Sequence, residues 1–204
     1  SNIGLGANAV NSITTGDYNV GIGDDAGTAI TEGHRNVFLG WETGKATTTG
    51  SNNNAIGKHA LLVNTTGGGN VAMGNGSLDA NTTASYNTAI GYNTLGANTT
   101  GTQNVALGSY ALDANTTADN NTAIGYQAAT SNTEGHSNVA VGVASFHTNT
   151  TGDSNTVVGY QALYNNTTAD NNTAVGKSAL AGNTTGAANV ALGKSALAGN
   201  TTGS

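Results

Sequence analysis

The chain has 204 residues, a formal net charge of −6 and only 8% charged residues, with 31 glycines and neither proline nor cysteine. The slight negative charge argues against nucleic acid and anionic membranes, both of which bind basic patches. Without cysteine no disulfide can staple the fold. No apolar run reaches the length of a membrane span, so we expect no membrane insertion by this segment.

An asparagine returns every 17 residues and divides the chain into repeat units. The consensus of a unit is N-[TV]-A-[ILV]-G-x-x-A-L-x-x-N-T-T-G-x-x, and we interpret residues 1–204 as one repeat domain. Disordered chains do not need an aliphatic residue at one fixed phase, so the strict spacing favours a folded repeat. The units begin at Asn2, Asn19, Asn36, Asn53, Asn70, Asn87, Asn104, Asn121, Asn138, Asn155, Asn172 and Asn189.

Each unit opens with a run that alternates like a strand. In the unit that begins at Asn104, Val105 and Leu107 form a bulky face, whereas Ala106 and Gly108 form a small one. The glycine in the fifth position predicts a turn or a close approach of two backbones. Equivalent glycines include Gly125 and Gly159.

A second extended run follows in the consensus A-L-x-x-N-T, as in residues 111–116, and a Thr-Gly step predicts a second turn. Seventeen residues are too few for a helix pair. Two strands and two turns instead predict an all-β fold, a parallel β-solenoid with one 17-residue rung per unit. Rungs stack at about 4.8 Å, so equivalent residues form columns. We expect the asparagine columns, with Asn104, Asn121 and Asn155, to form hydrogen-bonded ladders.

The predicted core of one rung is thin. It consists of Leu107 and Leu112, helped by Ala106 and Ala111. The remaining wall of alanine and glycine is suited to close packing against another chain. We therefore expect a homo-oligomer with closed symmetry.

The run N-[TV]-A-[ILV]-G resembles the N-S-V-A-I-G motif of the YadA-like heads of trimeric autotransporter adhesins, and the similarity covers every unit. This resemblance implies a left-handed parallel β-roll, three chains to a head, on a bacterial surface. Related motifs occur in trimeric fibres of phage tails. Units of that family are usually shorter, and the extra length here falls near N-T-T-G, which predicts a longer turn. Neither end carries a polar cap, so we expect a fragment of a longer fibre.

The sixth position of the unit varies most, which indicates the solvent face of a rigid rod. Aromatic residues at this position are candidates for contact with sugar or protein. The alternative is that they are ordinary surface residues that fill a shoulder of the rod. The candidates are Trp41, Tyr92, Tyr126 and Tyr160.

The motif T-E-G-H occurs twice and contains the pairs Glu32 with His34 and Glu134 with His136. A glutamate and a histidine could share a metal if several chains brought them together. Two ligands fall short of a metal site, however, and duplication of a repeat block also explains the copying. We therefore assign no metal and no cofactor.

Further polar residues have plain structural interpretations. His59 and His147 have no partner that the sequence reveals, and His147, next to Phe146, is expected to pack. The N-T-T sequences match the N-glycosylation pattern, but capping of a turn is the favoured interpretation because asparagine and threonine bond neighbouring amides. These sequences include Asn98, Asn115 and Asn183.

No catalytic motif is present, and the eleven acidic residues are scattered, which argues against a polysaccharide-cleaving β-helix. We expect a non-enzymatic fibre or adhesin segment, extracellular, on a bacterial surface or a virion tail. Its expected partners are two further copies of itself and a host or prey surface protein or glycan. One alternative is a pure spacer. Another is ice binding by a threonine column such as Thr82, Thr99 and Thr116.

Overall fold

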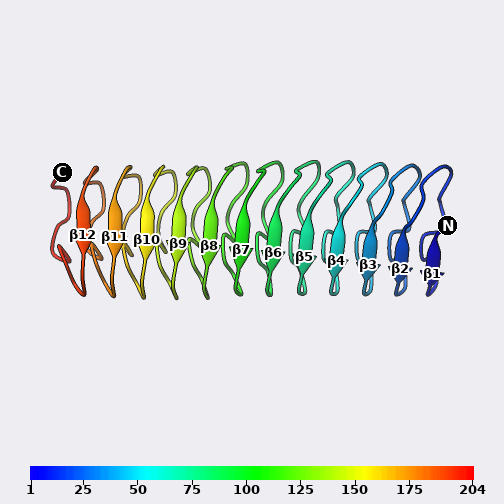
Figure 1. Cartoon of the computed structure of the whole chain (residues 1–204), viewed down its shortest axis with the longest axis horizontal. Helices are drawn as coiled ribbons and strands as arrows, with labels where there is room; N and C mark the ends of the chain where they lie inside the picture. The colour runs from blue at the N-terminus through cyan, green and yellow to red at the C-terminus, as the bar shows by residue number, and fades with distance from the viewer.

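The computed structural model describes all 204 residues as a coil of parallel rungs without helices, and each rung contributes one short strand. Figure 1 shows the strands side by side along the length of a rod, with the two termini at opposite ends. The strands are β1 (Ile3–Leu5), β2 (Val20–Ile22), β3 (Val37–Leu39), β4 (Asn54–Ile56), β5 (Val71–Met73), β6 (Thr88–Ile90), β7 (Val105–Leu107), β8 (Thr122–Ile124), β9 (Val139–Val141), β10 (Thr156–Val158), β11 (Thr173–Val175) and β12 (Val190–Leu192).

All strands belong to one parallel sheet in which spatial order follows chain order. Each residue pairs with the residue 17 positions later, as Val105 does with Thr122. Because this pairing never shifts, equivalent residues of the units lie in columns along the rod. The predicted parallel β-solenoid is confirmed.

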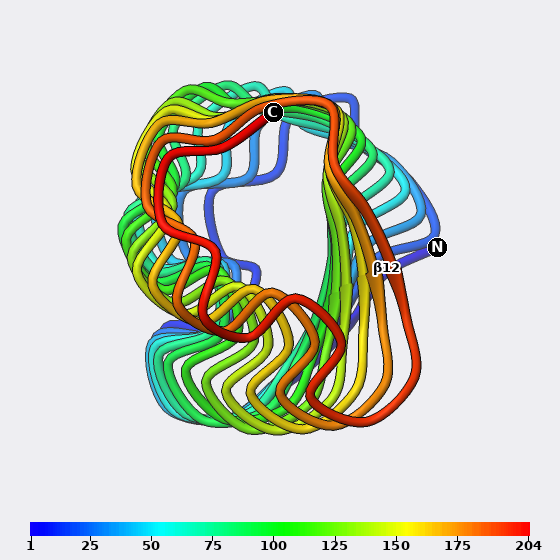
Figure 2. The ribbon, with the colours of Figure 1, turned by 90° about the vertical axis from the view of Figure 1, so that its left-hand side faces the viewer.

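The prediction of a second strand in each unit is wrong. Residues 109–114 form turns instead, and Tyr110 and Leu112 have φ angles of 60° and 50°. These left-handed residues curl the chain, although Leu112 N still donates to the carbonyl of Ala128 in the next rung at 3.1 Å. Backbone bonds between rungs therefore continue without strand geometry. Figure 2 shows the result, with strands along one side of the cross-section and the other residues closing the loop.

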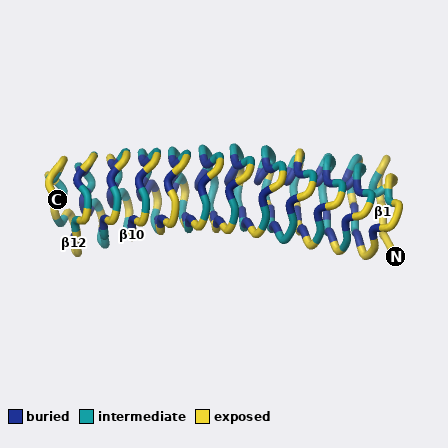
Figure 3. Tube along the Cα trace, turned by 90° about the horizontal axis from the view of Figure 1, so that it is seen from above, coloured by how far each residue is buried: buried dark blue, intermediate teal, exposed yellow.

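The small face of each strand, not the bulky one, points into the core. Ala106 is fully buried, whereas Val105 and Leu107 are 40% and 43% exposed. The predicted core role of Leu107 and the outward alanine wall are therefore both wrong, and the roles of Ala106, Ala111 and Leu112 are confirmed. The reason is space, since the leucine in position nine reaches across the narrow coil and leaves room for a methyl group. Figure 3 shows buried and exposed residues alternating along each rung in a pattern that repeats from rung to rung, with mostly exposed residues at the two ends of the rod.

Near the N-terminal end of the rod, a large residue at one core position is accompanied by a small residue at the facing position, so the core stays filled. Phe38 occupies the place of Ala106, and glycine occupies the place of Leu112 both in the same rung, at Gly44, and in the preceding rung, at Gly27. A Cβ atom on Gly44 would lie only 2.6 Å from the Phe38 ring. Large and small residues have thus exchanged sides of the core.

This exchange predicts a rescue. Phe38→Ala is expected to destabilise the protein by about 3–5 kcal/mol because it leaves a cavity, and Gly44→Leu alone is expected to destabilise it by overpacking. The double variant recreates the arrangement of the central rungs, and Leu61 shows that leucine accepts this backbone, with φ 57° against 59° at Gly44. We therefore expect the double variant to be more stable than either single variant in urea unfolding. Equal or lower stability would contradict the proposed packing.

Two asparagine ladders run through the interior, as expected. In the first ladder the Asn121 amide donates to Asn104 Oδ1 at 3.0 Å, and Asn104 Nδ2 donates to the Ala118 carbonyl at 2.8 Å. In the second, Asn115 Nδ2 donates to Asn98 Oδ1 at 2.8 Å. These side-chain amides thus join one rung to the next and also close their own rung, except at Asn172, whose buried Nδ2 has no partner.

The asparagines of the N-T-T sequences lie in the second ladder. Asn98, Asn115 and Asn183 are fully buried, and each donates to the carbonyl three residues later. The capping interpretation is confirmed. A buried side-chain nitrogen offers no attachment point for a glycan in the folded coil.

The glycine that follows each strand is a point of close backbone approach. Gly108 has φ 129°, and a Cβ atom there would lie 2.5 Å from the carbonyl oxygen of Gly125 in the next rung. The same holds at Gly125 and Gly159, whose φ angles are 138° and 135°. The predicted turn and close approach are both confirmed.

Candidate functional site

The sixth position of each unit, directly after the strand and its glycine, faces solvent as predicted. The aromatic side chains at this position are between 47% and 49% exposed. They therefore have an accessible ring face while the rest of the ring packs on the rod. These residues are Trp41, Tyr92, Tyr126 and Tyr160.

Three tyrosines form a continuous row, which we call the tyrosine row: Tyr92, Tyr110 and Tyr126. The Tyr110 ring lies between the other two, with centroid distances of 5.4 and 6.3 Å and nearly perpendicular planes. This edge-to-face arrangement is favourable for aromatic rings. Burial raises the pKa of Tyr110 above its usual value. Comparison of single columns missed Tyr110, because it occupies position seven rather than six.

Tyr160 does not belong to this row. Val143 occupies position six in the rung between Tyr126 and Tyr160. The Lys177 ammonium instead lies 5.6 Å from the centre of the Tyr160 ring, within the range of a cation–π contact. The structure therefore separates this candidate from the tyrosine row.

Trp41 lies in a second cluster near the N-terminal end of the rod. The His59 ring centre is 4.9 Å from that of Trp41, and the Lys58 ammonium is 4.8 Å from the Trp41 ring centre. His59 Nε2 is also 3.1 Å from Glu42 Oε2. The histidine for which the sequence revealed no partner therefore has two. The neighbours of Trp41 come from the next rung, so no local motif indicated them.

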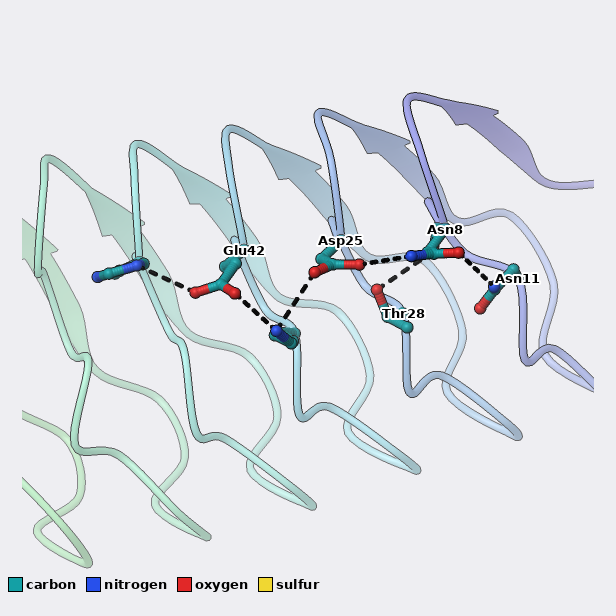
Figure 4. Close-up of polar contacts among 7 residues, drawn as sticks. Asn8, Asn11, Asp25, Thr28 and Glu42 are labelled. Carbon is teal, nitrogen blue, oxygen red and sulfur yellow. Dashed lines mark hydrogen bonds and ion pairs between the residues drawn. The ribbon is translucent and has the colours of Figure 1, made fainter.

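A file of polar contacts extends from this cluster along positions seven and ten. Lys45 Nζ is 2.6 Å from Glu42 Oε1 and 3.3 Å from Asp25 Oδ2. Asn8 Nδ2 donates to Asp25 Oδ1 at 3.0 Å, and Figure 4 shows these contacts stepping from rung to rung. The hydrogen bond from Lys45 lowers the pKa of Glu42, and the bond to Glu42 raises the pKa of Lys45. The pKa of Asp25 is lowered, first by the bond from Asn8.

A pocket of about 230 Å³ lies between the Trp41 cluster and the tyrosine row. It exists because Gly76 is the only glycine in position seven, so one side chain is missing from that column. His59 and Asn93 occupy the same position in the rungs on either side. The pocket is lined by Lys58, His59, Asn75, Gly76, Asp79, Tyr92 and Asn93.

The acidic residue of the pocket has a near neighbour of the same charge. Burial raises the pKa of Asp79. Asp113, two rungs away in the same column, also has a raised pKa, first from burial and then from the charge of Asp79. Gly96 lies between them, and a Cβ atom there would be 2.9 Å from Asp113 Oδ1 and 3.7 Å from Asp79 Oδ1. The two carboxylates thus converge over a residue without a side chain.

The histidines of the T-E-G-H motifs link rungs. His34 Nδ1 accepts a hydrogen bond from the Asp17 amide, and His136 Nδ1 accepts one from the Asp119 amide, each at 2.9 Å. The glutamates Glu32 and Glu134 are exposed. The structure brings together no group of three or more histidine, cysteine or acidic residues that could hold a metal.

The remaining histidine packs as expected. His147 stacks on Tyr164 of the next rung, with a centroid distance of 4.8 Å and an angle of 14° between the rings. Burial lowers the pKa of His147. The partner is again one unit away in the same column.

The threonine columns differ in what they offer to solvent. The hydroxyls of Thr82 and Thr99 donate to the carbonyl of the equivalent threonine in the next rung, at 3.1 and 3.0 Å. Only the column one position later, with Thr100 and Thr117, is exposed. A single outward file gives less support to ice binding than two parallel files would.

Comparisons with known proteins find no matching family model, no similar curated protein and no similar solved structure. The chain contains no helix long and apolar enough to cross a membrane.

Proposed function

We propose that this chain is a non-enzymatic segment of a trimeric extracellular fibre, whose outer wall serves attachment to a cell-surface protein or glycan. The observation that carries the proposal is the bulky face of the sheet. Position four is apolar in every strand, aliphatic in all but β5, where it is Met73, and Ile56, Leu107 and Ile124 are 36–43% exposed. Parallel sheets in soluble proteins are normally covered on both faces, and an extended apolar stripe marks an interaction surface.

The repeat of the stripe favours a second copy of the chain as its partner. The stripe follows the strand column along the rod and presents an apolar side chain at every rung. A partner that covers it must be equally long and must carry apolar groups at the same spacing. Another copy has both properties. Rods that pack around a common axis would bury their stripes together, which is the closed symmetry of most homo-oligomers.

The sequence motif supports three chains, since the trimeric YadA-like heads carry a similar run. It also supports the display of such a rod at a bacterial or virion surface. The wall at positions six and seven supports attachment, because it carries the exposed aromatic rings and the pocket. A rod without attachment would be a spacer, for which no surface pocket is needed.

The test is the molar mass in solution by light scattering. We expect three times the 20.0 kDa of one chain. The combined variant Ile90→Glu, Leu107→Glu and Ile124→Glu is expected to fall to the mass of one chain, because it buries three like charges in each copy of the seam. A wild-type mass of one chain at tens of micromolar protein would contradict the proposed assembly.

A matched control places the same charges on another wall. Position fourteen carries glutamate naturally at Glu134 and is exposed at Thr83, Thr100 and Thr117. The combined variant Thr83→Glu, Thr100→Glu and Thr117→Glu is expected to keep the wild-type mass. Loss of mass in both triple variants would show that added charge, rather than the apolar stripe, controls assembly.

A further inference from the structure

The pocket at Gly76 carries polar groups that the rest of the rod does not use. The side chains of Asp79 and Asn93 line the pocket and pair with no other side chain, although the backbone amides of Ala80 and Asp79 act on the Asp79 carboxylate and oppose the rise of its pKa. Asn75 uses Oδ1 to accept from the Lys58 amide at 3.1 Å, which leaves its Nδ2 available. The pocket therefore offers an acceptor in Asp79 and donors in Asn75, Asn93 and Lys58.

The charges in the pocket favour a neutral ligand. Lys58 and Asp79 have opposite charges and both line the cavity, so a charged ligand would be repelled by one of them. His59 Nε2 is buried 3.1 Å from Glu42 Oε2, and the His59 ring packs against Trp41, so this nitrogen is not exposed to a ligand. A ligand rich in hydroxyl groups matches this lining, because each hydroxyl both donates and accepts.

The size and the neighbours of the pocket favour one ring of a longer chain. Its volume of about 230 Å³ is below the roughly 300–1,000 Å³ of pockets for drug-sized ligands. The Tyr92 ring lines the pocket and also begins the tyrosine row, which continues through Tyr110 to Tyr126. Exposed aromatic rings with a polar tip suit surfaces that are partly wet. A ligand chain leaving the pocket would lie along this row, parallel to the rod.

We propose that the pocket at Gly76 and the tyrosine row together bind a neutral glycan. One hexose occupies the pocket, with its hydroxyl groups on Asp79, Asn93 and Lys58 and its ring against Tyr92. The following sugars lie over Tyr110 and Tyr126. This inference rests on the proposed function, since it names the ligand of the attachment wall.

The central test fills the pocket. Asparagine accepts left-handed backbone, so Gly76→Asn tolerates the φ of 65°, and the only atom within 3 Å of its Cβ would be the movable Oδ1 of Asn93. Ser178→Asn makes a matched change at position seven, φ 55°, five or more rungs from the pocket. We expect the wild type to bind at least one neutral oligosaccharide of glucose, galactose, mannose or N-acetylglucosamine on an array, confirmed by titration calorimetry. Gly76→Asn is expected to weaken this binding at least tenfold, and Ser178→Asn to leave it unchanged.

A second variant keeps the inference testable if Gly76→Asn fails to fold, as judged by circular dichroism. Asp79→Ala removes the acceptor and is expected to weaken the same binding by a similar factor. Absence of binding to any neutral oligosaccharide, binding confined to acidic glycans, or undiminished binding by both pocket variants would overturn the inference. Light scattering on the same samples separates the two proposals. A trimer that binds no glycan would refute the proposed glycan site, whereas a monomer that binds a glycan would refute the proposed trimer.

Discussion

Replacing Asn104 by alanine is expected to destabilise the coil by about 3 kcal/mol. The substitution removes the Oδ1 acceptor of the buried Asn121 amide, at 3.0 Å, and leaves that N–H without a partner. An unsatisfied buried donor costs about 1–3 kcal/mol, and each lost hydrogen bond adds about 0.5–1.5 kcal/mol. Asn104 Nδ2 also donates to the Ala118 carbonyl at 2.8 Å and to Asn87 Oδ1 at 3.2 Å. Urea unfolding followed by circular dichroism measures the loss.

Two further variants show whether this loss of stability comes from the hydrogen bonds of the ladder or only from the removal of side-chain atoms. Asn104→Asp keeps the shape and the acceptor but places a buried carboxylate against the Ala118 carbonyl and Asn87 Oδ1. It is therefore expected to be at least as unstable as Asn104→Ala at neutral pH, and to recover when acid protonates it. Thr117→Ala removes an exposed side chain of the same unit and is expected to change stability by less than about 0.5 kcal/mol. If Asn104→Ala were as stable as Thr117→Ala, the ladder would not hold the rungs together.

The correctly predicted parts of the fold are the positions at which every unit needs the same type of residue. The ladder asparagine and the glycine after the strand return in every unit, because each rung meets the same neighbour in the same geometry. A backbone distance too short for a side chain therefore appears in the sequence as an invariant glycine. The 17-residue period, the parallel sheet and the amide ladders followed from such columns.

Two predictions about the fold were wrong: which face of the strand is buried, and the second strand of each unit. In both cases the sequence pattern did not reveal the direction in which the side chains point. An alternation of large and small residues fixes two faces of a strand without saying which face is inside. Leu112 has φ 50°, a region that leucine seldom occupies. The prediction of a second strand assumed extended backbone at this position, and it therefore failed at a turn with left-handed residues. With the leucine of position nine crossing the core, the alanine face had to be the inner one.

The candidate site was only partly predictable, because many of its contacts join residues at different positions of the repeat unit. The exposure of Trp41, Tyr92 and Tyr126 followed from the variability of position six. The placement of Tyr110 between two of these rings depends on the offset between positions six and seven. The pocket depends on a missing side chain, and one glycine among 31 gives no signal until its neighbours are known. Handedness, trimer assembly and the attached ligand stay predictions.

Replacing Gly108 by alanine is expected to cost about 4 kcal/mol, from two separate causes. The first is backbone strain, since a φ of 129° is nearly restricted to glycine and costs other residues of order 1–3 kcal/mol. The second is collision, because the new Cβ atom would lie 2.5 Å from the Gly125 carbonyl oxygen. That oxygen belongs to the backbone and cannot move without separating two rungs. Urea unfolding again provides the measurement.

The chain supplies glycines that separate the two causes. Gly193 has φ 121°, but a Cβ atom there would meet nothing within 4 Å, so Gly193→Ala carries the strain without the collision. At Gly96 the φ is not left-handed and the nearest atom is the movable Asp113 Oδ1 at 2.9 Å, so Gly96→Ala is expected to change stability little. The expected order of cost is Gly108→Ala, then Gly193→Ala, then Gly96→Ala. The difference in stability loss between Gly108→Ala and Gly193→Ala measures the cost of the collision with the next rung. This difference would vanish if neighbouring rungs were not in contact at the glycine that follows the strand.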